Sequence, residues 1–174
     1  MTLTPGIIDF QLYLLKAMDP PQAVAAAALA ELDRSPEQMI ASFEKVHRST
    51  WILEGGSAEN ILPLVEGVGV PVPPCFSAVY EMAFALPLWP ELLLAVAFNS
   101  DSRVFDAVEF VRAPDSTQVP EVRPWRLLEK EAYEVFDRVE EVESWGDYRI
   151  LAARNGEHGE VHRLRFGRGL FCKT

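Results

Sequence analysis

The sequence is poor in the residues that build disulfide frameworks and phosphate-binding loops. It has only two cysteines in 174 residues, no CxxC pair, no Walker-type lysine loop, no complete dinucleotide glycine fingerprint and no GxSxG elbow. Two thiols as far apart as Cys75 and Cys172 are more typical of free cysteines than of a disulfide. We therefore expect no cofactor and assign no catalytic residues, and the sequence leaves open whether the chain is an enzyme.

Positive charge is also scarce. Sixteen Lys and Arg residues stand against twenty-six Asp and Glu residues, so the formal net charge is −10. A surface of this sign repels phosphate backbones, so we expect no nucleic-acid partner, whereas a basic protein partner would be attracted. The excess of Arg over Lys and the abundance of Ala and Leu are typical of a bacterial protein from a GC-rich genome.

No uninterrupted apolar run is long enough to predict a membrane span. The first 18 residues have no basic leader, and Asp9 and Lys16 interrupt their apolar pattern. The apolar stretch 76–98 contains Glu81 and Glu91 together with two prolines, so we interpret it as protein core. The expected location is the cytoplasm, without membrane association.

The residues that are abundant predict one globular α+β domain. Hydrophobic residues make up 49% of the chain and charged residues 24%, as in folded proteins of this size. We divide residues 1–174 into a helical part at 1–66, a proline-rich connector at 67–75 and a mixed α/β part at 76–174. Helix-start signals occur at Thr4-Pro5, at a capping box over 35–38 and at Ser57.

The mixed part is expected to form an antiparallel sheet of ββαββ type. Residues 76–86 suit a helix, and the runs 92–98 and 103–112 flank a polar turn, which favours a hairpin over a helix. A helix is predicted over 124–145, and a second hairpin over 147–167 completes the sheet. The apolar stripe that predicts this helix consists of Leu128, Ala132, Val135, Val139 and Val142.

The C-terminal hairpin contains the densest group of metal-binding residue types. With a three-residue loop at 156–158, Arg154 would face Glu160 and Ala152 would face His162. His158, Glu160 and His162 are then the candidate metal ligands, with His47 as a distant further ligand. The competing interpretation is an exposed His158, a half-buried His162 and no metal.

The acidic stretch 129–147 is the candidate partner-binding surface. On the predicted helix its outer face would carry Glu134, Asp137, Glu140 and Glu141. Such a face would steer a basic protein toward the chain. Alternatively, these acids are solvated side chains that the arginine-rich segment 149–174 neutralises.

Three functions remain open at this stage. The first is a non-enzymatic, cytoplasmic partner-binding protein that resembles immunity proteins, antitoxins or secretion chaperones in kind. The second is a small enzyme or a ligand- or metal-binding protein whose pocket uses His162, Glu160, His47 or Cys75. The third is a structural subunit that forms homo-oligomers through its N-terminal helices. The four tryptophans lie near the ends of elements, which favours core packing and, as an alternative, the walls of a pocket or interface.

Overall fold

The computed structural model describes residues 6–50, 67–98 and 105–174, which form three groups of elements. The first group contains the helices α1 (Ile7–Met18), α2 (Gln22–Glu31) and α3 (Pro36–Thr50). Next to it lies the first sheet, with strands β1 (Gly69–Val70), β2 (Met82–Ala85), β3 (Leu92–Phe98) and β4 (Phe105–Arg112). The third group is α5 (Glu129–Val135) with the second sheet, β5 (Arg138–Trp145), β6 (Tyr148–Arg154), β7 (His162–Gly167) and β8 (Leu170–Lys173).

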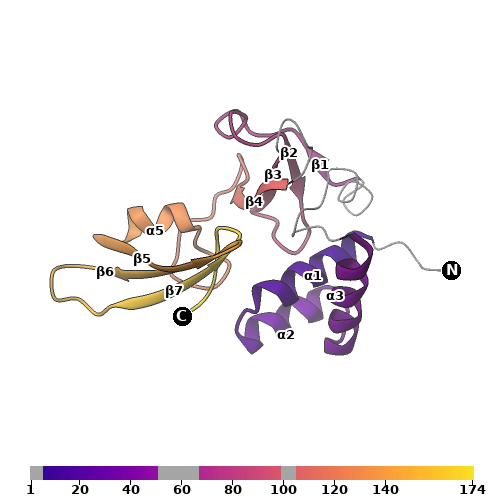
Figure 1. The fold of residues 1–174 in the computed structure, drawn as a ribbon, viewed down its shortest axis with the longest axis horizontal. Coiled ribbons are helices and arrows are strands. Elements are labelled where there is room, and N and C mark those ends of the chain that lie inside the picture. Colours follow the sequence, from indigo (N-terminus) through magenta and orange to yellow (C-terminus); the bar gives the residue numbers. More distant parts are fainter. Residues whose placement is uncertain (1–5, 51–66, 99–104) are drawn as a thin grey trace.

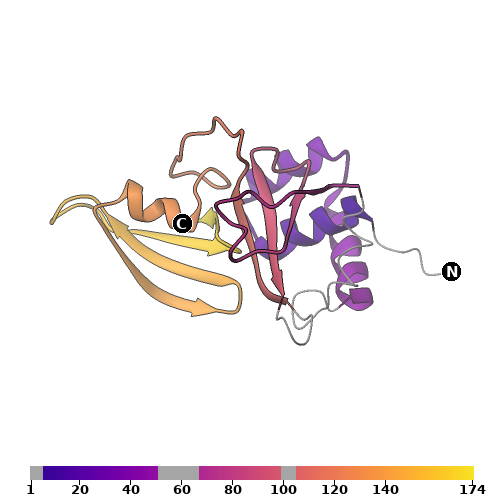
Figure 2. The same ribbon diagram turned by 90° about the horizontal axis from the view of Figure 1, so that it is seen from above.

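The predicted α+β class is confirmed. The helices described before residue 67 are followed by antiparallel strands, and each sheet has its strands in sequential order. The helices and the first sheet both lie beside one end of the second sheet, and α5 covers one face of the second sheet (Figures 1 and 2). The two expected hairpins therefore lie in two separate four-stranded sheets.

The helical group is organised around α1, whose central residues are buried. All residues from Phe10 to Leu15 are buried, because α3 packs against the helix and the first sheet shares its hydrophobic cluster. Gln11 is the polar residue in this run, and its side-chain oxygen accepts a hydrogen bond from the Leu88 backbone N–H at 2.7 Å. That bond offsets the cost of burying an amide.

The predicted capping box at the start of α3 is confirmed. The Gln38 backbone N–H donates to Ser35 Oγ at 3.3 Å, and the Ser35 backbone N–H donates to Gln38 Oε1 at 2.8 Å. These two bonds satisfy donors that a helix start leaves unpaired. The other start signals, at Thr4-Pro5 and Ser57, lie outside the described residues, as does the turn at 99–102.

Both faces of the first sheet are covered, and this explains its sequence. Every residue of β3, LLLAVAF, is buried. Leu94 and Val96 face the cluster shared with the helices, whereas Leu93 and Ala95 face a cluster that includes the chain segment 70–80. A strand buried on both faces needs a continuous apolar run rather than an alternating one. The predicted pairing of 92–98 with the following strand is confirmed over the described residues.

The helix predicted over 76–86 is wrong. Residues 74–79 form turns, and β2 follows, paired with β3. Ala83 and Phe84, only 1% and 2% exposed, enter the two different hydrophobic clusters on opposite faces of the sheet. A short apolar run that is buried on both sides satisfies helical and extended patterns equally, so the pairing with β3 decided the outcome.

The helix predicted over 124–145 is also wrong, except over Glu129–Val135. The helix is α5, which ends where Phe136 adopts an extended conformation, and β5 begins at Arg138. Gly146, the residue after the predicted helix, has φ +54° in the tight turn between Trp145 and Tyr148, which pair across the strands. The β-branched residues of the predicted stripe fit a strand at least as well as a helix.

The register predicted for the hairpin over 147–167 differs by one residue. His162 pairs with Ala153, and Leu164 pairs with Leu151, because the connection between β6 and β7 spans 155–161. A shift of one position moves every side chain to the other face of a sheet. Leu151 and Ala153 therefore face α5 in the second hydrophobic cluster, and Ile150 lies on the opposite face.

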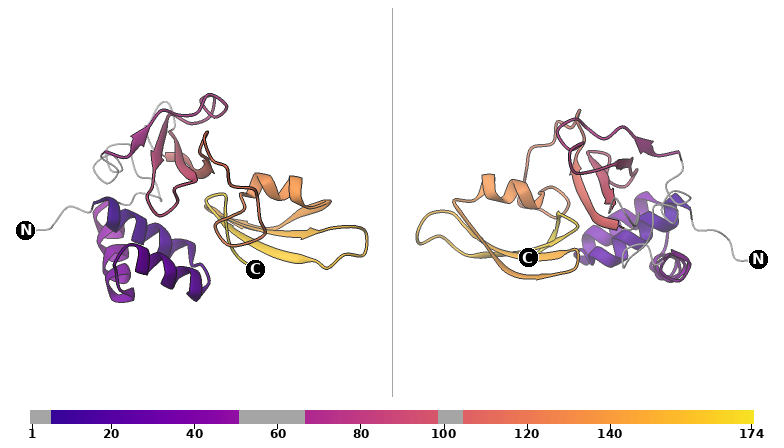
Figure 3. Two further views of the ribbon diagram at one scale, coloured as in Figure 1. Left: turned by 180° about the vertical axis from the view of Figure 1, so that it is seen from behind. Right: turned by 45° about the horizontal axis from the view of Figure 1, so that its top comes forward.

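The final strand connects the two sheets. Leu170 and Cys172 belong to the hydrophobic cluster of the helices and the first sheet, whereas Phe171 belongs to the cluster beneath α5. The second sheet also contacts α1 directly, because Tyr148 Oη donates to the Ala17 carbonyl oxygen at 2.6 Å. The helices and the end of the second sheet are accordingly seen side by side (Figure 3). Within the described part of the chain, no helix has the length and hydropathy needed to cross a bilayer.

Candidate functional site

The acidic residues predicted to bind a partner do not share one helix face. Glu134 is on α5, Asp137 lies between α5 and β5, and Glu140 and Glu141 are on β5. All four are exposed. Since neighbouring strand residues point to opposite faces, the structure divides the predicted surface between the helix and the two sides of an edge strand.

The edge strand β5 is the most exposed strand of the molecule with described side chains. Seven of its eight residues are exposed, and among the described strands it pairs only with β6. Glu140 forms an ion pair with Arg138 at 2.8 Å, and Glu141 lies 3.6 Å from Arg149. Two large apolar side chains on the same strand are also exposed, Val142 by 50% and Trp145 by 43%. We call Arg138–Trp145 with its three glutamates the acidic edge.

Asp137 has a structural role at the start of this edge. Its carboxylate accepts a hydrogen bond from the Gly156 N–H at 2.7 Å, and its own backbone N–H donates to Asn155 Oδ1 at 3.1 Å. The two bonds fasten the β6–β7 connection to the beginning of β5. Replacing Asp137 would therefore alter this connection as well as the surface charge.

The candidate metal ligands lie near one another in sequence but in different surroundings. His158 and Glu160 are exposed in the β6–β7 connection, and the His162 ring packs at 5.8 Å from the ring of Phe136. Arg154, predicted to face Glu160, instead donates a hydrogen bond to the Glu157 carbonyl oxygen at 2.8 Å. Among the described residues, no three His, Cys, Asp or Glu side chains gather closely enough to hold a metal ion.

His47 and Cys75 are not near this hairpin. His47 is exposed on α3, where its ring stacks on Phe43 with ring centres 5.9 Å apart. Cys75 is exposed in the turns before β2, and both it and the buried Cys172 are unbridged. The β6–β7 connection and α3 lie at opposite ends of the molecule (Figure 1). The structure therefore does not bring together the pocket residues proposed from the sequence.

The structure instead forms a cleft of about 490 Å³ between α2 and two loops. The helix contributes a wall of small side chains that includes Ala23 and Ala27, and the opposite wall contains Trp89 and Trp125. The two indole rings meet edge to face, with centres 5.4 Å apart. We call this the tryptophan cleft. Its volume lies within the range of small-molecule sites, ~300–1,000 Å³.

The buried indole N–H groups of these two tryptophans are the clearest polar feature that sequence analysis did not find. Trp89 is 3% exposed, and neither Trp89 Nε1 nor Trp125 Nε1 has a hydrogen-bond partner although both atoms are buried. Trp125 also has φ +65°, a left-handed conformation that is strained for a bulky residue. Buried unpaired donors and backbone strain are both uncommon, and both occur preferentially at functional positions.

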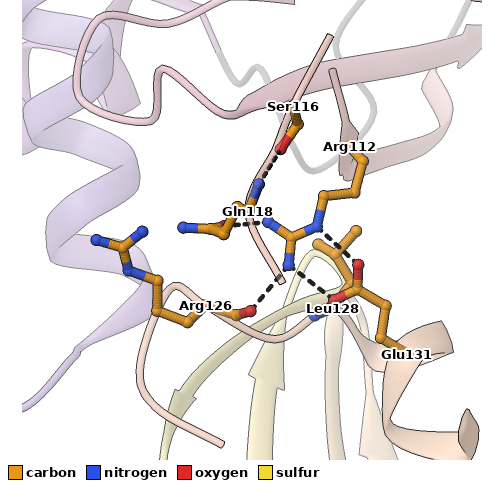
Figure 4. Close-up of polar contacts among 6 residues, drawn as sticks. All are labelled: Arg112, Ser116, Gln118, Arg126, Leu128 and Glu131. Carbon is orange, nitrogen blue, oxygen red and sulfur yellow. Dashed lines mark hydrogen bonds and ion pairs between the residues drawn. The ribbon is translucent and has the colours of Figure 1, made fainter. Parts of the chain in front are cut away.

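A network centred on Arg112 holds the loop that forms one wall of the cleft (Figure 4). The Arg112 guanidinium donates two hydrogen bonds to the Glu131 carboxylate, at 2.7 and 2.9 Å, and one to the Arg126 carbonyl oxygen at 2.8 Å. It also contacts the Gln118 side chain. The Glu131 carboxylate in turn accepts the Leu128 N–H at 2.8 Å and caps α5. The side chain of Arg126 extends toward α2 (Figure 4), so the network fixes the backbone and leaves this cation at the cleft.

A second cleft, of about 450 Å³, lies between the helices α1 and α3 and the turn after β5. It contains Arg168, whose side chain is 4% exposed and has one carboxylate partner, Asp147, at 3.1 Å. Arg168 Nε and Nη1 have no partner. This ion pair joins the β7–β8 turn to the β5–β6 turn, which gives it a structural role.

Comparison with protein families, with curated proteins and with solved structures finds no match to this chain. The sequence offered one signal for the tryptophan cleft, since Trp89 and Trp125 each stand next to a proline near the end of an element. It gave no signal for the Arg112 network, whose members are separated by up to 19 positions.

Proposed function

We propose that the protein is a non-enzymatic binding protein whose acidic edge takes up an extended basic segment of a partner protein. The observation that carries the proposal is the exposure of β5: seven of its eight residues are exposed at the edge of a sheet. An unpaired edge presents backbone N–H and C=O groups to which another strand can add.

The side chains of β5 define what kind of strand would fit. Glu140, Glu141 and Glu143 supply negative charge, and Val142 and Trp145 supply exposed apolar surface. A segment that alternates Lys or Arg with Val or Ile would match both features, because cross-strand neighbours of opposite charge attract. The net charge of −10 would also speed the encounter with a basic partner.

Two synthetic peptides of identical charge test strand addition. The first alternates Lys with Val, and the second replaces the Val residues by Pro, which removes backbone donors and prevents strand pairing. We expect the first peptide to bind at low salt at least about tenfold more tightly than the second, since main-chain hydrogen bonds supply much of the affinity of an added strand. Isothermal titration calorimetry measures both affinities. Equal affinities, or no binding of the first peptide, would contradict the proposal.

A charge-reversal pair locates the binding surface. The variant E140K/E141K should lose most of the affinity for the Lys-Val peptide, and binding that remains should become less sensitive to salt. The control variant D115K/E121K carries the same charge change on exposed loop residues away from β5. If the control variant lost as much affinity as the β5 variant, net charge rather than the acidic edge would be responsible.

A further inference from the structure

The cleft between α1, α3 and the turn after β5 has aromatic side chains on both of its walls. On the α3 wall, the rings of Phe43 and His47 are nearly parallel, with an angle of 5° between their planes. On the opposite wall, the rings of Trp145 and Tyr148 stack at an angle of 19°, with centres 5.7 Å apart. The cleft lies where the helices and one end of the second sheet are side by side (Figure 3), and we call it the aromatic cleft.

The side chains that line this cleft include several that solvent reaches. His47 is exposed, and Phe43 and Tyr148 are half-buried. Trp145 is 43% exposed, although Tyr148 stacks on its ring. An aromatic ring that enters the cleft therefore meets accessible ring surface on both walls, and stacked rings attract one another beyond the area that they bury.

The charge of the lining is opposite in sign to that of the whole chain. Lys16, Arg168 and Asp147 are its charged side chains and together carry +1, in a chain whose net charge is −10. Arg168 and Asp147 bind each other at 3.1 Å. Among the described residues, the exposed Lys16 forms no ion pair or hydrogen bond through its ammonium group, and its charge acts on Asp19, which already binds Lys173.

These two properties select the class of ligand. The ammonium group of Lys16 would repel an organic cation, and an aliphatic anion would leave the ring surfaces without a stacking partner. A planar aromatic ring with one acidic group satisfies both, because the ring stacks and the anionic oxygens accept charge-assisted hydrogen bonds. The volume of about 450 Å³ suits one such molecule, since small-molecule sites span ~300–1,000 Å³.

Two hydrogen bonds fix the walls of the cleft without using the groups offered to a ligand. The bond from Tyr148 Oη to the Ala17 carbonyl oxygen joins the hairpin to α1. The Arg168 backbone N–H donates to the Asp147 carbonyl oxygen at 2.8 Å, beside the ion pair of their side chains. A site whose walls are already in place loses less conformational entropy when a ligand binds.

We propose that the aromatic cleft binds a small organic anion that has a planar aromatic ring. The acidic group of the ligand accepts from Lys16 Nζ, and its ring packs against Trp145 and against the wall formed by Phe43 and His47. This site shares Trp145 with the acidic edge but uses none of the three glutamates. It therefore goes beyond the proposed function, and either proposal can fail without the other.

Three related probes test the chemistry. Indole-3-acetate is planar and anionic, indole-3-acetamide is planar and uncharged, and cyclohexylacetate is anionic without a planar ring. In ¹⁵N-labelled protein, indole-3-acetate should shift the indole N–H signal of Trp145 and leave that of the buried Trp89 in place. It should bind about tenfold or more tightly than either analogue, because one analogue loses the charge-assisted hydrogen bond and the other loses stacking.

The outcomes that overturn the proposal follow from the same titrations. An unchanged Trp145 signal would place no ligand in the cleft. Equal affinities for indole-3-acetate and indole-3-acetamide would remove the role of the acidic group, and equal affinities for indole-3-acetate and cyclohexylacetate would remove the role of the rings.

A charge-neutral variant with a matched control tests the named cation. Lys16→Met keeps a long side chain on an exposed position of α1 and should weaken indole-3-acetate binding about tenfold, measured by isothermal titration calorimetry. Lys130→Met makes the same charge change on the exposed face of α5 and should have no effect. Equal losses in the two variants, or none in Lys16→Met, would overturn the assignment of Lys16.

A second variant tests the ring on the opposite wall. Trp145→Leu replaces an exposed side chain, and should abolish the preference for indole-3-acetate over cyclohexylacetate because stacking on that wall is lost. If the preference were kept in the variant, Trp145 would not contact the ligand, and the proposed site would be wrong.

Discussion

The two sheets have the same number of strands and the same antiparallel order, but they differ in how much of their surface is covered. The first is enclosed by helices on one face and by the segment 70–80 on the other, and β3 has no exposed residue. The second packs α5 against one face, and β5 is almost entirely exposed. The first sheet is therefore part of the protein core, whereas the second leaves an edge strand open to solvent.

The largest change in the free energy of unfolding is predicted for a substitution in the core of the first sheet. Phe110 is 2% exposed and packs against Trp89, with ring centres 5.0 Å apart. Phe110→Ala should lower the free energy of unfolding by about 3–5 kcal/mol, the cost of losing a buried ring and leaving a cavity. Urea denaturation measures the change. A loss below about 1 kcal/mol would show that the first sheet is less tightly packed than described.

A smaller effect is expected at the connection between the sheets. Glu131→Ala removes the carboxylate that accepts two hydrogen bonds from Arg112, and leaves the guanidinium without its counter-ion. Removing one member of a fully buried ion pair lowers the free energy of unfolding by about 3–5 kcal/mol. Because the Arg112 and Glu131 side chains are 18% and 14% exposed, we expect a loss of roughly 2 kcal/mol. Glu131→Gln retains an acceptor and should lose less in the same urea measurement. Equal losses would assign the effect to the missing charge rather than to the helix cap, which an amide oxygen can still provide.

The contact between α1 and the second sheet should depend on pH. A hydrogen bond from Lys173, assisted by the charges of Lys173 and Arg165, lowers the pKa of Asp19 despite some burial. A carboxylate whose pKa is lowered by folding stabilises the protein above its unfolded pKa, near 4, and loses that contribution as the pH falls through the lower, folded value.

Asp19→Asn should therefore destabilise the protein by up to about 1 kcal/mol at pH 7, because the ion pair is largely exposed. The difference from the wild type should shrink as the pH is lowered below 4. Thermal unfolding at pH 7 and pH 3 measures both values, with the exposed Asp115→Asn as control. A difference that grew at low pH would contradict the assigned direction of the pKa shift.

The smallest effect is predicted at the acidic edge. Val142 is 50% exposed and lies at an irregularity in the pairing of β5 with β6. Val142→Thr keeps the branched shape and should change the free energy of unfolding by less than about 0.5 kcal/mol. A larger loss would show that this residue packs against something and that the second sheet is less open than the comparison suggests.

The sequence predicted the features that depend on local chemistry. The capping box of Ser35 and Gln38 and the pairing around 92–112 follow from residue spacing and were confirmed. The helix over 124–145 was predicted wrongly because its stripe of valines suits both periods over a few residues. Only pairing with β6, the next strand along the chain, selects the strand.

The candidate sites also depend on contacts that local sequence patterns do not predict. The acids were correctly expected to be exposed, but their grouping on one face depended on the wrong helix. The register of the last hairpin depended on a loop length that no glycine or proline fixed unambiguously, and a slip of one residue exchanged the faces. The tryptophan cleft requires the Arg112 network, whose residues are distant in sequence, so no local pattern predicted it.

The position of β8 has a consequence for how the chain acquires its structure during synthesis. Leu170 and Cys172 complete one hydrophobic cluster and Phe171 completes the other, yet these residues follow every other described element in sequence. While a ribosome still holds them, neither cluster can close, and the apolar strands before them remain exposed. Folding is then expected to await release of this segment, and the nascent chain is a natural client for chaperones that shield apolar segments.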